Sequence, residues 1–203
     1  MPSGRTHDRI TLWSLPLVAG FTFSQTLSGN LTLLVSSGFL FGGLMFGPDL
    51  DIYSRQFQRW GFLRSIWIPY QKNLRHRSFL SHGPMIGTAL RSLYLLCWIG
   101  VLGWLLLSIA ELLGVKMITW PTVVQLAVAS VREQPRAWTA LFVGLELGAM
   151  SHTLSDWGDS TLKRLKSGGL KAILPKANPP KRKYTKVSAA KRTAKTQKPQ
   201  KKR

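Results

Sequence analysis

The residues best suited to chemistry in this chain of 203 residues are its four histidines, each of which lies near a carboxylate or another histidine. The segments that contain them are THD, HRSFLSH and SHTLSDW, and the segment GPDLD adds two further aspartates. Neutral imidazole nitrogens and carboxylate oxygens together form sites for Zn²⁺, Mn²⁺ or Fe²⁺. The sequence therefore predicts a divalent metal site, with zinc favoured and manganese or iron as alternatives. The candidate ligands are His7, Asp49, Asp51, His76, His82, His152 and Asp156.

Two pairs among these residues have a spacing that indicates their geometry. His152 and Asp156 are four residues apart on a predicted helix, so their side chains share one face, which is how a helix offers two ligands to one ion. Asp49 and Asp51 follow a proline that cannot continue a helix, so we expect an extended or turn backbone there. A surface hydrogen bond is the alternative for the first pair, and a capping or Asx-turn motif is the alternative for the second.

The segment HRSFLSH places an arginine beside the first histidine of its pair. A guanidinium next to a metal is suited to binding phosphate or stabilising a developing anion. Asp49, Asp51 and Arg77 are therefore the candidate catalytic residues, with either aspartate as a bridging ligand or general base. The alternatives are an arginine placed by membrane charge alone, and a histidine pair that contacts anionic headgroups.

Long uncharged stretches predict the helices that position these residues. No charged residue lies between Ile10 and Pro48, and the turn-like segment 28–30 divides this stretch into two spans of about 18 residues, near the lower limit for crossing a bilayer. Residues 92–110 and 137–155 predict two more spans, and residues 117–131 a short interfacial or re-entrant helix. A soluble bundle would show charges with a 3.6-residue period, which these runs lack. We therefore expect an all-α integral membrane helical bundle of about four transmembrane helices plus one short interfacial helix.

Basic residues set the predicted orientation in the bacterial inner membrane. Two Lys or Arg residues precede the first span, seven lie in segment 47–91, and sixteen follow Asp156. By the positive-inside rule, both termini and segment 47–91 are cytoplasmic. Every candidate ligand then lies at the cytoplasmic end of a span.

The C-terminal segment differs in composition from the rest of the chain. Residues 161–203 hold 16 of the 28 Lys and Arg residues and none of the eight acids, whereas residues 1–160 hold 12 basic and eight acidic residues. We expect a helical membrane domain over 1–160 and a disordered polybasic tail over 161–203. The tail is suited to anionic lipid headgroups, and nucleic acid is the less favoured partner. The single cysteine excludes disulfides within the chain.

Four segments of the chain resemble a bacterial family of uncharacterised, predicted metal-binding membrane proteins. These segments are SGRTHDRIT, GPDLDIYSRQFQRWG, IWIPYQKNLRHRSFLSHGPMIGTALR and SHTLSDW. That family is distantly similar to predicted metal-dependent hydrolases of the inner membrane, which carry an N-terminal His, a PDxD segment, a His-Arg-Gly-x-Thr-His segment and a final His-x-x-x-Asp. The resemblance covers about residues 3–160, implies metal binding by the seven candidate ligands, and implies hydrolysis only as a prediction.

One difference from that pattern concerns the histidine pair. This chain has Ser78 where the pattern has glycine, and one more residue lies between the histidines. On a helix one residue rotates a side chain by about 100°. We therefore expect His82 to differ in position from its counterpart unless the segment is a loop.

Three functions are compatible with these features. The first is a metal-dependent hydrolase that acts on a phosphoester or lipid-like substrate at the cytoplasmic membrane interface, where a metal lowers the pKa of water. The second is a non-catalytic membrane protein whose metal joins helix ends in a closed site. The third, a metal-ion carrier, would place its ligands at mid-membrane, and the expected ligands lie at one face instead.

Overall fold

A computed structural model describes residues 4–76, 78–115 and 118–168, so Arg77 and the basic tail from residue 169 lie outside the described part of the chain. Helices are the regular elements of the described residues. In chain order they are α1 (Gly4–Thr26), α2 (Gly29–Leu44), η1 (Pro48–Asp51), α3 (Arg55–Gln58), η2 (Gly61–Trp67), α4 (Ile68–Asn73), α5 (Phe79–His82), α6 (Ile86–Leu112), α7 (Trp120–Glu133) and α8 (Pro135–Gly168), where η marks a 3₁₀ helix.

The predicted all-helical fold is confirmed, and each predicted long helix lies within an observed one or overlaps it. By length and apolar composition, two of the described helices are able to cross a membrane, namely Gly29–Asp51 and Ile86–Leu112. The four-span membrane bundle is therefore not confirmed. The last helix is also longer than predicted, since α8 continues through residues 161–168, which the sequence assigned to the tail.

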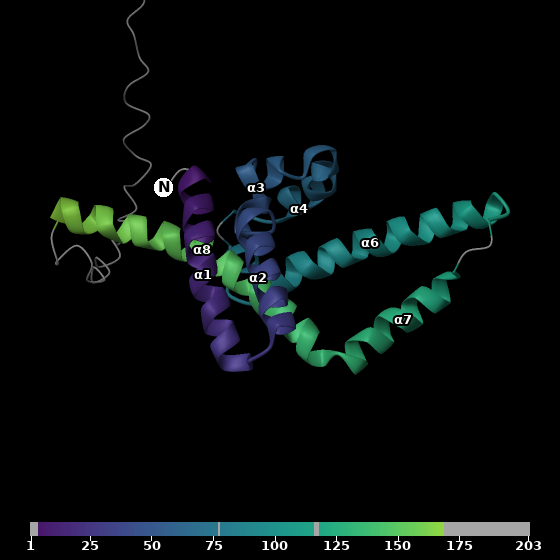
Figure 1. Ribbon diagram of the computed structural model, residues 1–203. Coiled ribbons are helices and arrows are strands. Elements are labelled where there is room, and N and C mark those ends of the chain that lie inside the picture. Colours follow the sequence, from purple (N-terminus) through teal and green to yellow (C-terminus); the bar gives the residue numbers. More distant parts are fainter. Residues whose placement is uncertain (1–3, 77, 116–117, 169–203) are drawn as a thin grey trace, which may run out of the picture. The chain divides into compact units, whose positions relative to one another are not determined.

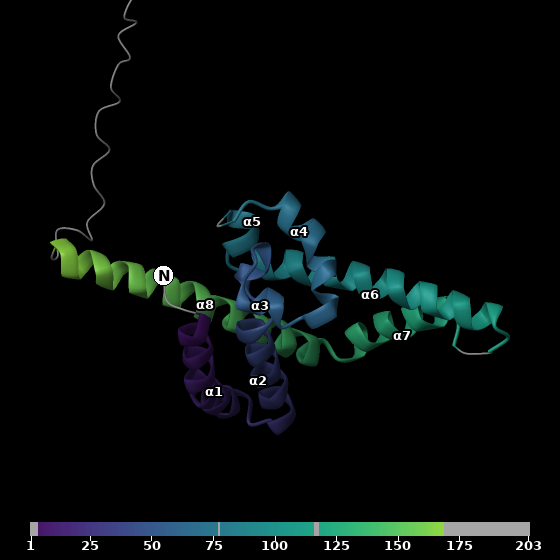
Figure 2. The same cartoon turned by 90° about the horizontal axis from the view of Figure 1, so that it is seen from above.

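The N-terminal half of the site is carried by a helical hairpin. α1 and α2 run side by side in both views (Figures 1 and 2), joined by the short turn at residues 27–28. Ser28 begins α2 because its hydroxyl accepts a hydrogen bond from the Leu31 N–H at 3.4 Å. The hairpin places the start of α1 beside the end of α2.

Glycines allow α2 and α8 to cross with their backbones in close contact. α2 carries Gly38 and Gly42, and α8 carries Gly144 and Gly148, which is the G-x-x-x-G spacing in both helices. A Cβ atom added to Gly42 would lie 2.4 Å from the Leu145 carbonyl oxygen, and one added to Gly148 would lie 2.3 Å from the Phe39 carbonyl oxygen. The crossing brings the next turn of α8, which carries His152, to the C-terminal end of α2.

An aromatic cluster forms the core of the segment between α2 and α6. Its buried members share no regular spacing, and partly buried residues of α2 and α6 pack against them. Trp67 is completely buried and makes edge-to-face contacts with three other rings of this region. The sequence did not predict the short helices of this segment. The buried members are Phe46, Leu50, Phe57, Trp67 and Tyr70.

Two glutamine side chains fix η1, the turn that carries Asp49 and Asp51. Gln71 donates hydrogen bonds to the carbonyl oxygens of Leu50 and Ile52 at 3.0 and 2.9 Å. Buried Gln56 donates to the Gly43 carbonyl oxygen at 2.9 Å, which ties this region to the end of α2. Gln71 thus fixes the backbone directly after each of the two aspartates.

Candidate metal centre

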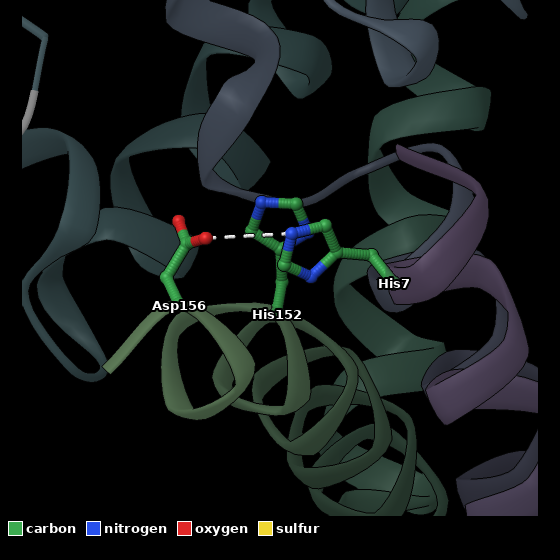
Figure 3. A group of neighbouring side chains, drawn as sticks. All are labelled: His7, His152 and Asp156. Atoms are coloured by element: carbon green, nitrogen blue, oxygen red, sulfur yellow. Dashed lines mark ion pairs between the residues drawn. The ribbon is translucent and has the colours of Figure 1, made fainter. Parts of the chain in front are cut away.

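One group of candidate ligands lies between α1 and α8. Figure 3 shows His7 from α1 stacked on His152 from α8, with Asp156 beside them. The two imidazole rings are 3.9 Å apart between centroids, and His7 Nε2 is 3.4 Å from Asp156 Oδ1. The side chains of His7 and His152 are 7% and 5% exposed and that of Asp156 is 20% exposed, so the two imidazoles are nearly closed to water and the carboxylate is partly accessible. The i, i+4 spacing of His152 and Asp156 acts as predicted, since one helix face presents both residues to His7.

A second group contains Asp49, His76 and His82, with donor atoms within 4.8 Å of one another. Asp49 Oδ1 is 3.8 Å from His82 Nε2, and the two imidazole rings meet edge to face with centroids 5.1 Å apart. This group is more accessible than the first, because the side chain of His76 is 31% exposed.

Neighbouring residues orient both imidazoles of the second group. The fully buried carboxylate of Asp51 lies 2.9 Å from His76 Nδ1, and a carboxylate only accepts, so His76 donates through Nδ1 and keeps Nε2 free. Ser81 Oγ lies 2.9 Å from His82 Nδ1 and accepts from it in the tautomer that leaves Nε2 facing Asp49. Asp51 thus positions a histidine in the manner of the carboxylate–histidine pairs found around metals.

Asp49 joins the two groups through its two carboxylate oxygens. Oδ1 faces His82 of the second group, and Oδ2 lies 3.0 Å from His152 Nε2 of the first group. Donors on one zinc ion, each about 2.0–2.2 Å from the metal, lie roughly 3–4 Å apart. The separations on both sides of Asp49 fall in this range.

The protonation and hydrogen bonding of the residues fit a cation. Burial lowers the pKa of His7, and nearby His152 lowers it further. Burial also lowers the pKa of His82. Neutral imidazole is the form that binds metal. Several buried atoms of the site also lack a hydrogen-bond partner among the described residues, as expected of atoms that face an ion. They are Nδ1 of His7, Nδ1 of His152 and Oδ2 of Asp51.

All seven predicted ligands therefore lie in one continuous cluster, whereas Arg77 lies outside the described residues. His152 and Asp156, which the sequence places at the end of the predicted span 137–155, lie within α8, and that helix continues to Gly168. Sequence reasoning missed Ser81 and did not foresee that Gln56 and Gln71 fix η1. The sequence offered one signal for Ser81, namely that it directly precedes the candidate ligand His82.

The family model described as uncharacterized metal-binding protein (DUF2227) matches residues 2–166, and the chain belongs to that family. A relative from Aquifex aeolicus (strain VF5), described as an uncharacterized protein, is 41% identical over 59 residues. That alignment covers 29% of this chain and 41% of the relative, so the chain spans less than half of the relative's length. No solved structure matches the chain. The family and the His/Asp groups agree in identifying a metal-binding protein.

Proposed function

We propose that this chain is a metal-dependent hydrolase with a two-ion centre, which acts on a phosphoester or lipid-like substrate at the cytoplasmic face of the membrane. One observation carries the proposal: the two oxygens of Asp49 face two separate histidine groups. A carboxylate shared between two ions is suited to hydrolytic centres in which the ions stand about 3.5–4 Å apart. Zinc is the favoured ion, with manganese or iron as alternatives.

The residues divide into roles according to their contacts. His7, His152 and Asp156 would hold one ion, and His76 with His82 the other, with Asp49 shared. Asp51 would orient His76, since its Oδ1 accepts from Nδ1 of that ring. A bound divalent ion in such a site acts as a Lewis acid and lowers the pKa of water toward neutrality.

Exposure assigns different tasks to the two groups. The two imidazoles of the first group are nearly closed to solvent, which suits a structural ion, whereas the second group includes the accessible His76. Catalytic metal sites keep a position open for water or substrate. Hydrolysis therefore belongs to the Asp49, His76 and His82 group.

The second candidate function, a purely structural metal site, is supported by the burial of the first group. Its ligands come from both ends of the chain, so an ion there would join α1 to α8. The ion-carrier alternative lacks such support, because the charged neighbours of the site, Asp8, Arg55 and Arg59, form an exposed ion-pair cluster beside it.

The membrane part of the proposal rests on exposed apolar side chains. α6 is long and apolar enough to cross a bilayer, and none of its apolar window is buried within the chain. Exposed leucines, isoleucine and tryptophan cover it, including Leu93, Ile99 and Trp104. We propose an inner-membrane location with both termini cytoplasmic. Reporter fusions after residue 29 and after residue 114 should be periplasmic, and a cytoplasmic signal at both would refute this orientation.

The basic segment 161–203 is proposed to contact anionic lipid headgroups. Removing residues 169–203 should weaken binding to vesicles that contain anionic lipid and leave metal content unchanged. If the truncated chain binds such vesicles as tightly as the full chain but no longer binds nucleic acid, nucleic acid is the favoured partner of this segment.

The hydrolase proposal is tested by metal content and activity in the same preparations. Detergent-purified protein should contain about two ions per chain, and His152→Ala should lose the first ion while His76→Ala loses the second. Asp49→Ala should lose both, whereas Glu133→Ala, an exposed carboxylate on α7, should lose neither. If metal-loaded protein hydrolyses neither phosphomonoesters nor phospholipids, the hydrolase proposal is wrong and the structural metal site is the remaining function. Unchanged metal content in both histidine variants would overturn the site itself.

A further inference from the structure

A small cavity of about 120 Å³ adjoins the second ligand group and contains charged residues that the metal centre does not use. His82 and Pro48 form its wall on the metal side. Its other polar lining residues include Arg91 and Thr88 from α6 and Glu146 from α8. The remaining wall is apolar and includes Met150 and Leu154 of α8.

Arg91 is a buried cation with no direct contact to a described carboxylate: Tyr70 is a further hydrogen-bond partner, and Glu146 and Asp51 attract it through space. Only 1% of the residue is exposed, and no carboxylate among the described residues lies within ion-pair distance of it. Its guanidinium donates to the Ser81 carbonyl oxygen at 2.8 Å and to Thr88 Oγ1 at 3.0 Å, while Nε has no partner. A guanidinium has five N–H donors, so donors remain for an anion. A buried charge is stable only when it is paired.

Glu146 supplies the opposite charge on the other side of the cavity. Its Oε1 accepts from the Met85 N–H at 2.9 Å, which holds Met85 at a φ of 60°, a conformation that side-chain-bearing residues rarely adopt. Its Oε2 is buried and has no partner. Glu146 and Arg91 attract each other through space but form no direct ion pair, so each keeps donor or acceptor capacity for a ligand.

We propose that this cavity binds the polar head of the substrate, and that the head is zwitterionic, with an anionic phosphate for Arg91 and an ammonium for Glu146. Phosphoethanolamine is the simplest group of this class. The proposal rests on the hydrolase function above, because His82 places the phosphate beside the second ligand group. Exposed Leu154 and Pro84 on the cavity wall favour a lipid as the source of the head over a soluble phosphoester.

Calorimetric titration of the zinc-loaded protein in detergent tests the subsite. Phosphoethanolamine should bind at least about tenfold more tightly than phosphocholine, whose trimethylammonium group cannot donate to Glu146, and more tightly than inorganic phosphate. Each lost charge-assisted hydrogen bond is worth roughly tenfold to a hundredfold in affinity. Dihexanoyl phosphatidylethanolamine binding more tightly than free phosphoethanolamine supports the lipid source, whereas equal binding supports the subsite and overturns the lipid source.

Matched substitutions assign the binding to the two residues. Glu146→Gln should remove the preference for phosphoethanolamine over phosphocholine, and Arg91→Lys should weaken every phosphate probe by about tenfold. The same changes on exposed α7, Glu133→Gln and Arg132→Lys, should do neither. Unchanged selectivity in Glu146→Gln overturns the proposal. If the variants fail to fold, equal affinity of the native protein for phosphoethanolamine and phosphocholine overturns it as well.

Zinc content separates this subsite from the proposed hydrolase function. If the protein binds zinc at full stoichiometry but binds none of the probes, the subsite proposal is wrong and the hydrolase proposal still stands. Selective phosphoethanolamine binding to protein that takes up no zinc, manganese or iron defeats the hydrolase and leaves the subsite.

Discussion

Replacing Gly148 with alanine should disrupt the metal centre although Gly148 contacts no ligand. A Cβ atom there would lie 2.3 Å from the Phe39 carbonyl oxygen and 2.6 Å from the Gly43 nitrogen, both of which are backbone atoms that cannot rotate away. Ordinary contact begins at 3.4 Å, so α8 must move from α2 by about 1 Å. His152 lies one turn beyond Gly148 and would move with the helix. Its 3.0 Å approach to Asp49 would then be lost.

The expected loss has a stability part and a binding part. Overpacking of this kind costs about 1–3 kcal/mol in the free energy of unfolding, and the displaced ligand should lower metal affinity by about tenfold or more. Thermal unfolding in detergent and a competitive chelator titration measure these two quantities on the same sample.

Two other helical glycines provide matched controls for the same substitution. Gly20 in α1 and Gly158 in α8 have no atom within 4 Å of an added Cβ. Alanine there should raise stability by up to about 1 kcal/mol through helix propensity and leave metal affinity unchanged. The reasoning is refuted if Gly148→Ala binds metal as tightly as the native protein and unfolds no earlier than the controls.

Three further outcomes follow from the structure. Asp51→Asn keeps an acceptor for His76 but removes the charge, so metal affinity should fall about 10–100-fold in a chelator titration; an unchanged affinity would show that Asp51 does not orient the ring. Trp67→Ala should cost about 3–5 kcal/mol in unfolding free energy, whereas Trp13→Ala, at an 82% exposed position, should leave the unfolding temperature nearly unchanged; equal effects would contradict the aromatic core. Removing metal with a chelator should lower the unfolding temperature, with a loss of about 2.7 kcal/mol at a free metal concentration 100 times Kd, and Asp49→Ala should show no such response.

The long helices were predictable because their residues leave few alternatives. A stretch such as 10–48 without one charged side chain indicates helices, and the turn-like Ser28-Gly29-Asn30 marked the division that the structure places at residues 27–28. The segment between α2 and α6 was not predictable in this way. Its helices are as short as four residues, too short to show a period. Its core residues Phe46, Phe57 and Trp67 are brought together by packing across the segment.

The members of the metal centre were predictable from residue type, but their grouping was not. Clusters of histidine and aspartate near helix ends identified all seven candidates. Which imidazole faces which oxygen of Asp49 depends on how closely α8 approaches α2, and that distance is set by Gly42 and Gly148. Two G-x-x-x-G spacings in the sequence were the signal for this crossing. Glu146 had a signal of its own, since it is the one charged residue in the predicted span 137–155 and a charge there should face the bundle interior. Arg91 had none, because its importance comes from its contacts in the folded chain.

The additional residue between His76 and His82 shows why spacing alone misplaces a ligand. A rotation of about 100° would apply if one helix carried both histidines. In the structure His76 lies before α5, and Ser78 begins that helix by accepting a hydrogen bond from the Ser81 N–H at 3.3 Å. Because Ser78 stands at the glycine position of that pattern, the additional residue lies after it, within α5, where it turns His82 about the helix axis. Ser78 is the cap of α5, the helix that presents His82 to Asp49.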